Sequence, residues 1–130
     1  YANAMSRPIL EAGDEAASGL EFARSLGGYP PGLRLLPTPI DHVYPSAQPF
    51  DLLGLSLLAY PVRGHSPDSH VFALTLDGRR CLFSADVFFY GGLLGVINAA
   101  GSSLAGYRDD LPSLAALDFD ALFPSHGLFT

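Results

Sequence analysis

Residues 70–86 read HVFALTLDGRRCLFSAD and decide the fold class. Two apolar segments, residues 70–76 and 80–84, have the length and composition of short strands. The Asp77-Gly78 dipeptide between them is typical of a two-residue hairpin turn. Because such a turn joins antiparallel strands, this stretch predicts a β-hairpin.

Apolar segments on both sides of this hairpin extend it into a sheet. Residues 52–62 form a long apolar run, and the prolines before and within it favour a strand over a helix. Residues 52–84 together therefore predict an antiparallel meander. A last short strand is expected at residues 121–124, directly before a Ser-His-Gly turn.

Helices are expected on either side of the sheet. Residues 14–26 place apolar side chains at helical spacing and are followed by a Gly-Gly pair that stops a helix. Residues 102–106 predict a helical turn. Residues 109–117 predict a short helix that is capped by one of its two leading aspartates, with Pro112 in the first turn. The predicted fold class is α+β, with a mostly antiparallel sheet and flanking helices.

The composition of the chain excludes several classes of protein. No apolar window approaches 18 residues, and no signal-peptide pattern is present, so we expect neither a membrane span nor secretion. The net charge is −6, with seven arginines and no lysine, which argues against nucleic-acid and anionic-membrane partners. A single cysteine, Cys81, excludes an internal disulfide and fits a reducing compartment. We therefore expect a cytoplasmic protein.

The ends of the chain suggest an excised segment. Residues 1–4 precede Met5 and look like the remnant of a cleaved tag, so they are left out of the predicted fold. Residues 5–130 are long enough for one domain. The chain ends in apolar residues without a stop signal, so we expect 5–130 to be a single partial domain.

Three turns each present a metal-binding side chain at a strand end. His65 follows the strand that ends near Gly64, Asp86 leaves the hairpin strand, and His126 follows the last strand. Taken singly, each is most simply a solvated turn residue, and Asp86 is equally suited to cap a turn. Taken together, two imidazoles and a carboxylate at neighbouring strand ends suit zinc or iron.

The region from about Asp51 to Phe129 resembles the C-terminal half of a metallo-β-lactamase-fold hydrolase, as in glyoxalase II and its relatives. That superfamily has the motifs Gly-His-Thr/Ser-Pro-Gly-Ser, Phe-Ser-Gly-Asp and Pro-Gly-His-Gly. The matching segments here are residues 64–69 (GHSPDS), 83–86 (FSAD) and 124–127 (PSHG). The resemblance implies half of an αββα fold.

The resemblance also implies a metal-dependent hydrolase with two metal ions in the intact parent, zinc or alternatively iron or manganese. His65, Asp86 and His126 would be metal ligands, and Asp86 would be the catalytic carboxylate that bridges the ions. Metal-activated water would attack an ester, thioester or similar bond of a small-molecule substrate.

Other family features are missing. The His-x-His-x-Asp-His motif is absent, and the two remaining histidines, His42 in a Pro-rich loop and His70 at a strand start, are read as structural. Three motif glycines are replaced, by Asp68, Ala85 and Ser125. The fragment is therefore expected to bind metal partially or not at all and to be inactive alone. Apolar surface left exposed predicts a homodimer. The alternative is a non-catalytic α+β interaction or binding module with relic metal motifs.

Overall fold

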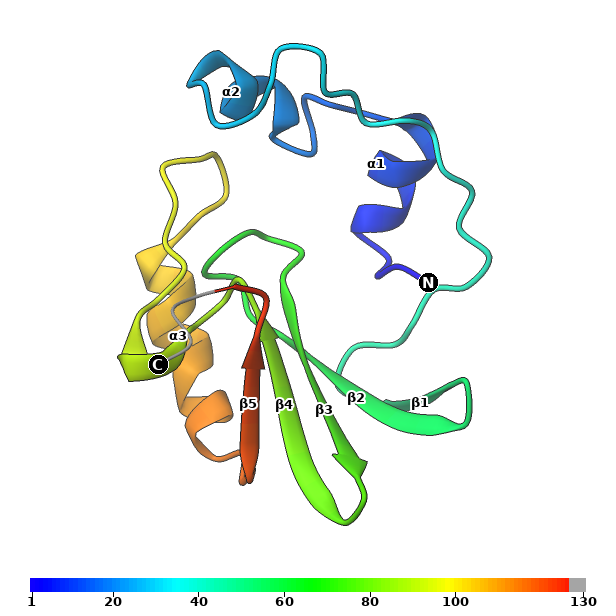
Figure 1. Ribbon diagram of the computed structural model, residues 1–130, viewed down its shortest axis with the longest axis vertical. Helices are drawn as coiled ribbons and strands as arrows, with labels where there is room; N and C mark the ends of the chain where they lie inside the picture. The colour runs from blue at the N-terminus through cyan, green and yellow to red at the C-terminus, as the bar shows by residue number, and fades with distance from the viewer. Residues whose placement is uncertain (127–130) are drawn as a thin grey trace. The chain divides into compact units, whose positions relative to one another are not determined.

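The computed structural model describes residues 1–126 and divides the chain into two compact units, Tyr1–Tyr44 and Pro45–Thr130. Figure 1 shows the helices of the first unit and the sheet of the second. Within residues 1–126, no helix combines the length and the apolar character needed to cross a membrane.

The first unit contains two short helices, α1 (Ser6–Ala12) and α2 (Leu20–Ser25), joined and followed by irregular chain. Residues 2 and 3 belong to its packing, although they were left out of the predicted fold. Ala2 pairs with Val43 in an isolated parallel bridge. The side chain of the buried Asn3 accepts hydrogen bonds from the backbone at Met5 (2.9 Å) and Ser6 (2.7 Å) and so supports the start of α1.

The predicted helix over residues 14–26 is wrong in its first half. Only Leu20–Ser25 is helical, because Gly19 has a left-handed backbone (φ 78°) and interrupts the pattern. The side chain of Asp14 accepts from the backbone of Ala17 in a separate turn before it. Helix α1, which the sequence did not predict, ends at the left-handed Gly13.

The second unit is a five-stranded sheet in the order β1-β2-β3-β4-β5, with one long helix, α3 (Leu104–Ala115), and a 3-10 turn, η1 (Tyr90–Gly92). All neighbouring strands are antiparallel except β4 and β5, which are parallel. This confirms the predicted α+β class with a mostly antiparallel sheet. The strands are β1 (Pro49–Leu52), β2 (Leu55–Pro61), β3 (His70–Leu76), β4 (Arg79–Ala85) and β5 (Ala121–Pro124).

The apolar run over residues 52–62 is two strands rather than one. Leu53 and Gly54 have positive φ angles of 55° and 83°, so they form a second two-residue hairpin, between β1 and β2. Leu53 is 94% exposed, as expected at the tip of a turn. The sequence hid this turn because a leucine rarely occupies a left-handed position.

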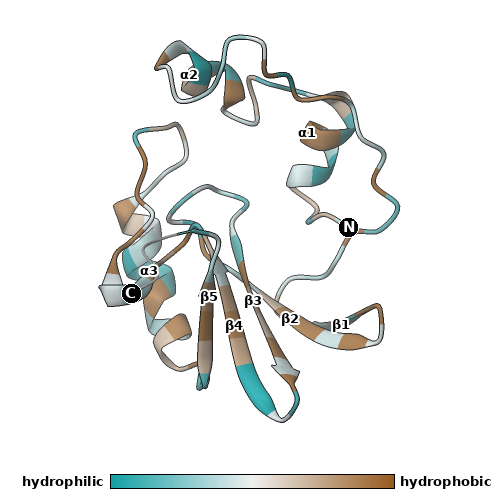
Figure 2. Ribbon diagram, viewed as in Figure 1, coloured by the Kyte–Doolittle hydropathy of each residue, from teal (hydrophilic) through white to brown (hydrophobic). Residues whose placement is uncertain are grey.

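Helix α3 covers one face of the sheet and forms the core with it. Figure 2 shows hydrophobic colouring along the strands and on part of α3. The buried side chains of this core are Val62, Val71, Leu82, Val87, Tyr107 and Leu114. Burial of each stabilises the fold by roughly 1.5–3 kcal/mol, because its apolar surface leaves water.

Helix α3 joins two elements that the sequence predicted separately. The turn expected at 102–106 and the helix expected at 109–117 are one helix, capped by Ser103, whose side chain accepts from the backbone of Gly106. Pro112 lies inside this helix rather than in its first turn, so that earlier placement was wrong. The aspartates expected to cap it have other partners.

Two arginine–aspartate contacts tie the helix and the last strand to the sheet. The backbone N–H of Arg63, just after β2, donates to Oδ2 of Asp110 in α3 (2.8 Å), and its guanidinium donates to Oδ1 (2.7 Å). Arg80 of β4 contacts Asp120 in the same way, through its backbone N–H (2.8 Å) and its guanidinium (2.7 Å), and its guanidinium also donates to Asp118. Hydrogen bonds from Arg80 lower the pKa of Asp120 to about 2, and those from Arg63 lower the pKa of Asp110.

These lowered pKa values predict how stability depends on pH. A carboxylate whose folded pKa lies below its ordinary value of 3.8 stabilises the fold above that value, and this contribution is lost as pH falls toward 2. We expect the free energy of unfolding of the second unit to fall between about pH 4 and pH 2. Urea unfolding at a series of pH values should show a smaller decline in Asp120→Asn and an unchanged one in the control Asp41→Asn. A decline in Asp120→Asn as large as in the unsubstituted chain would show that Arg80 does not stabilise the fold through Asp120.

The last residue of β4, Ala85, has a strained backbone, which leads to a second prediction. Ala85 has a positive φ of 48°, a conformation that costs a residue with a side chain about 1 kcal/mol. Ala85→Gly should therefore raise the free energy of unfolding by about 1 kcal/mol in urea titrations. The control Ala105→Gly, at an exposed position in α3, should lower stability by up to about 1 kcal/mol. If both variants lose stability, Ala85 is not strained.

Candidate metal site

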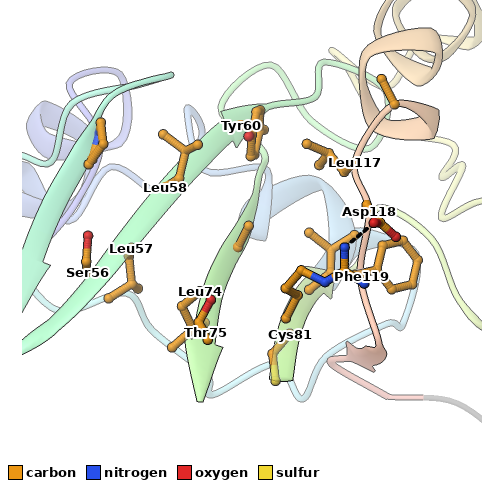
Figure 3. Close-up of a pocket in the computed structure, with 15 residues that line it drawn as sticks. Ser56, Leu57, Leu58, Tyr60, Leu74, Thr75, Cys81, Leu117, Asp118 and Phe119 are labelled. Atoms are coloured by element: carbon orange, nitrogen blue, oxygen red, sulfur yellow. Dashed lines mark hydrogen bonds and ion pairs between the residues drawn. The ribbon is translucent and has the colours of Figure 1, made fainter. Parts of the chain in front are cut away.

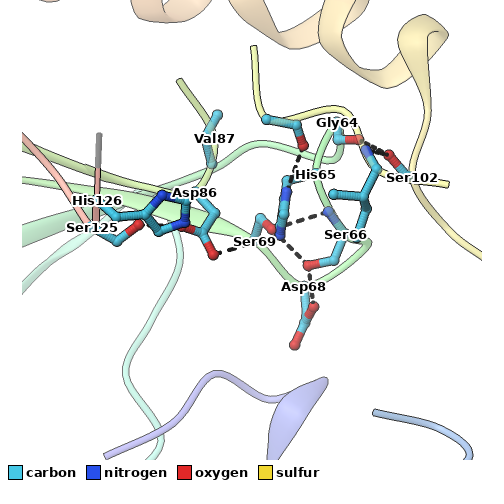
Figure 4. A network of polar contacts seen from close by, with 12 residues as sticks. Gly64, His65, Ser66, Asp68, Ser69, Asp86, Val87, Ser102, Ser125 and His126 are labelled. Atoms are coloured by element: carbon cyan, nitrogen blue, oxygen red, sulfur yellow. Dashed lines mark hydrogen bonds and ion pairs between the residues drawn. The ribbon is translucent and has the colours of Figure 1, made fainter. Parts of the chain in front are cut away.

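The strand directions bring the three predicted site residues to one edge of the sheet. Strands β4 and β5 are parallel, so Asp86 and His126, which follow their C-terminal ends, lie at the same edge. Strand β2 runs in the same direction as β4 because each is antiparallel to β3. The turn after β2 therefore delivers His65 to that edge as well. Figure 4 shows these side chains together.

The carboxylate of Asp86 lies between the two imidazoles. Its Oδ1 is 3.0 Å from Nε2 of His126, and its Oδ2 is 3.8 Å from Nε2 of His65. The three side chains differ in exposure: His65 is 20% exposed, Asp86 41% and His126 73%. Solvent therefore reaches the site from the side of His126.

The ring of His65 is oriented by a backbone carbonyl. Its Nδ1 is 2.5 Å from the carbonyl oxygen of Gly95, which can only accept a hydrogen bond. A neutral ring then carries its proton on Nδ1 and presents the lone pair of Nε2 toward Asp86. Imidazoles that bind metals are commonly oriented in this way.

The turn that carries His65 is stabilised by its own side chains. The backbone of Ser66 donates to Oγ of Ser69 (3.1 Å), and Oγ of Ser66 donates to the carboxylate of Asp68 (2.7 Å). Asp68 replaces a motif glycine, and φ at this position is not in the left-handed region. The replacement therefore adds a hydrogen-bond acceptor to the turn without backbone strain.

The other two ligand candidates also have neighbours that orient them. Oγ of Ser125 donates to Oδ1 of Asp86, a contact that the usual motif glycine could not make. The ring of His126 lies against that of Phe89, with centroids 5.0 Å apart. The backbone N–H of Ser125 donates to the carbonyl of Ala85 (3.1 Å), which extends the pairing of β4 and β5 up to the site. The last motif residue, Gly127, lies outside the described residues.

The two remaining histidines have neighbours other than the three candidate ligands. Both nitrogens of His70 have partners, Nε2 with Oγ of Ser46 (2.8 Å) and Nδ1 with the carbonyl of Asp68 (2.9 Å). His42, in the first unit, lies against the ring of Tyr1, with centroids 4.8 Å apart. Both observations agree with the structural roles that the sequence suggested for these two residues.

The side chains around Asp86 have the atom types that bind a metal ion, but too few of them are suitably arranged. Imidazole nitrogen and carboxylate oxygen are ligands of zinc and iron. Across residues 1–126, however, no group of three or more His, Cys, Asp or Glu side chains is arranged to hold a metal ion. The geometry is that of two imidazole–carboxylate pairs that share one carboxylate.

Sequence reasoning missed two residues that shape this site. Gly95 is one glycine among 14 in the chain, and nothing in its local sequence marks it as the acceptor for His65. Phe89 lies between two other aromatic residues in the sequence, but its contact with His126 depends on how the chain folds after β4. The contact between Ser125 and Asp86 had one signal in the sequence, the replacement of a motif glycine by serine at position 125.

A groove of about 520 Å³ lies elsewhere on the second unit, between the sheet and the segment that follows α3. Figure 3 shows its lining, which is largely apolar and includes Leu58, Tyr60 and Leu117. Arg80, which also lines the groove, forms ion pairs with Asp118 and Asp120. None of the three candidate ligands lines this groove.

Known proteins share this fold. The solved structure of BLEG-1 B3 metallo-β-lactamase is similar to 100% of this chain and 58% of its own, with 23% identity and a TM-score of 0.75. A metallo-β-lactamase with a HARLDQ motif from Cronobacter sakazakii (Enterobacter sakazakii) is similar over 97% of this chain and 46% of its own, with 21% identity and a TM-score of 0.63. TTHA1623 in a di-iron-bound form is similar over 98% of this chain and 57% of its own, with 27% identity and a TM-score of 0.60.

The chain thus spans about half the length of the solved structures that it matches. No match was found among curated proteins. The family model of the metallo-beta-lactamase superfamily matches residues 5–126, which is nearly the whole chain and includes all three candidate ligands. This chain belongs to the metallo-β-lactamase superfamily.

Proposed function

We propose that this chain is part of a metal-dependent hydrolase and that His65, Asp86 and His126 are its share of the metal ligands. The observation that carries the proposal is the position of the Asp86 carboxylate, which has one oxygen 3.0 Å from His126 and the other 3.8 Å from His65. A carboxylate that faces a different imidazole with each oxygen is suited to bridge two ions. Family membership supports this assignment.

The proposed reaction is the attack of water on an ester, thioester or similar bond of a small molecule. When bound, a zinc or iron ion lowers the pKa of water, so that hydroxide is available near neutral pH. The chain itself contributes the orientation of the ligands: Gly95 fixes the ring of His65, and Ser125 fixes one oxygen of Asp86. The exposed ring of His126 leaves the site open to a substrate from solvent.

The similar structures help to narrow the choice of metal ion and of the bond that is hydrolysed. TTHA1623 is described in a di-iron-bound form, which supports iron beside zinc as a candidate metal. BLEG-1 and the Cronobacter protein are named as β-lactamases, which makes the cyclic amide of a β-lactam one bond of the proposed class. We therefore propose only the class of substrate, a small molecule with an ester, thioester or similar bond.

The incomplete ligand set supports the second candidate function, a non-catalytic α+β interaction or binding module with relic metal motifs. Across residues 1–126 the donors around Asp86 do not form a site of three or more ligands. We therefore propose that this chain alone binds metal weakly and does not catalyse hydrolysis. The homodimer suggested by the sequence stays a prediction, to be tested by light scattering.

Zinc binding by the ligand variants tests the proposed function. In a zinc titration followed by NMR, the resonances of His65 and His126 should shift together, and Asp86→Asn should weaken the apparent affinity about tenfold or more because the bridging charge is lost. Asp77→Asn is the matched control, since it makes the same charge change in the β3–β4 turn, at the opposite end of β4. It should leave the affinity unchanged.

Two outcomes of this titration would count against the hydrolase. If excess zinc moves neither His65 nor His126, the interaction-module alternative is favoured. If zinc binds but Asp86→Asn binds it as tightly as the unsubstituted chain, Asp86 is not a ligand.

A further inference from the structure

The segment between β4 and α3 returns to the candidate site and places Gly95 there. Phe88 pairs with Leu94 in an antiparallel bridge, and the backbone of Phe89 donates to the carbonyl of Leu93 (2.8 Å). The backbone of Gly95 then donates to the carbonyl of Val87 (3.0 Å). Gly95 is therefore fixed beside the chain segment that carries Asp86.

Gly95 lies against two of the three candidate ligands, His65 and Asp86. Its carbonyl oxygen accepts the hydrogen bond from Nδ1 of His65 (2.5 Å). A Cβ atom at this position would overlap the backbone carbonyl of Asp86 and lie 3.2 Å from Nδ1 of His65. The φ angle of Gly95 is not in the left-handed region, so the position requires glycine for space rather than for conformation.

A second set of contacts holds the same segment against the turn of His65. The backbone of Ser103 and Oγ of Ser102 both donate to the carbonyl of Gly64 (2.9 and 3.1 Å). A Cβ atom at Gly101 would lie 2.6 Å from the ring of Pro67, so these two residues are also in close contact. Because the segment is attached to the turn here as well, Gly95 has little freedom to move away from His65.

We propose that Gly95 is a positioning residue of the candidate metal site, which sets the tautomer of His65 through its carbonyl and sets the spacing of His65 and Asp86 through its missing side chain. A neutral imidazole binds a metal only through the nitrogen that lacks a proton. The hydrogen bond to Gly95 keeps the proton on Nδ1 and leaves Nε2, 3.8 Å from Asp86, as the donor to a metal. The metal-binding part of this proposal rests on the proposed function, whereas the tautomer does not.

The tautomer of His65 in the unsubstituted, metal-free chain is the first test. Long-range proton–nitrogen NMR spectra distinguish a ring protonated at Nδ1 from one protonated at Nε2, and at about pH 8.5 imidazoles are ordinarily neutral. We expect His65 to be protonated at Nδ1, in contrast to the Nε2–H form that predominates in free histidine. A spectrum of the Nε2–H form would overturn the proposal without any variant.

The variant Gly95→Ala is the second test, with Gly32→Ala as its control. A Cβ atom at Gly32 meets no atom within 4 Å, and φ there is not in the left-handed region, so the control adds the same methyl group without a collision. In Gly95→Ala we expect His65 to become a mixture of tautomers, and any apparent zinc affinity to fall about tenfold or more. Gly32→Ala should match the unsubstituted chain in both measurements.

The outcomes separate this proposal from the proposed function. If zinc does not bind the unsubstituted chain, the metal assignment fails, but the tautomer still decides whether Gly95 orients His65. If Gly95→Ala folds, as judged by amide NMR spectra, and keeps the Nδ1–H tautomer and the zinc affinity, Gly95 is not a positioning residue. If Gly95→Ala does not fold, the tautomer in the unsubstituted chain gives the answer alone.

Discussion

The parallel pairing of β5 with β4 is the constraint on which the candidate site depends. In an otherwise antiparallel sheet, it makes two strands end at the same edge, so that Asp86 and His126 leave the sheet as neighbours. The helix α3 makes this pairing possible, because a parallel neighbour needs a long connection that crosses the sheet face. The core between α3 and the sheet therefore determines the geometry at the sheet edge.

The residues around the three candidate ligands explain why each side chain points as it does. A backbone carbonyl orients His65, a hydroxyl orients Asp86, and an aromatic ring lies against His126. The replaced motif glycines have different effects: Ser125 adds a hydrogen bond to Asp86, whereas Ala85 adds backbone strain. Departures from a motif can therefore strengthen one part of a site and weaken another.

The sequence predicted the sheet well where its signals were local. The boundaries of β3 and β5 and the Asp77-Gly78 turn follow from alternation, chain length and turn chemistry. It failed at Leu53, where an apolar residue occupies a turn position, and in the region of α3, where a proline inside the helix was taken to mark its start. The candidate ligands were visible because their motifs are short and ordered. The role of Gly95 could not be predicted, because it depends on a contact between two residues that lie 30 positions apart in the sequence, Gly95 and His65.

The proposed metal site depends on Asp86 serving as a ligand shared between His65 and His126. X-ray diffraction from crystals soaked in zinc, with data collected on both sides of the zinc absorption edge, tests this arrangement. We expect an anomalous peak in contact with the Asp86 carboxylate and with Nε2 of at least one of the two histidines. Ordered density for all three side chains with no peak among them, or with zinc bound only elsewhere, would contradict it.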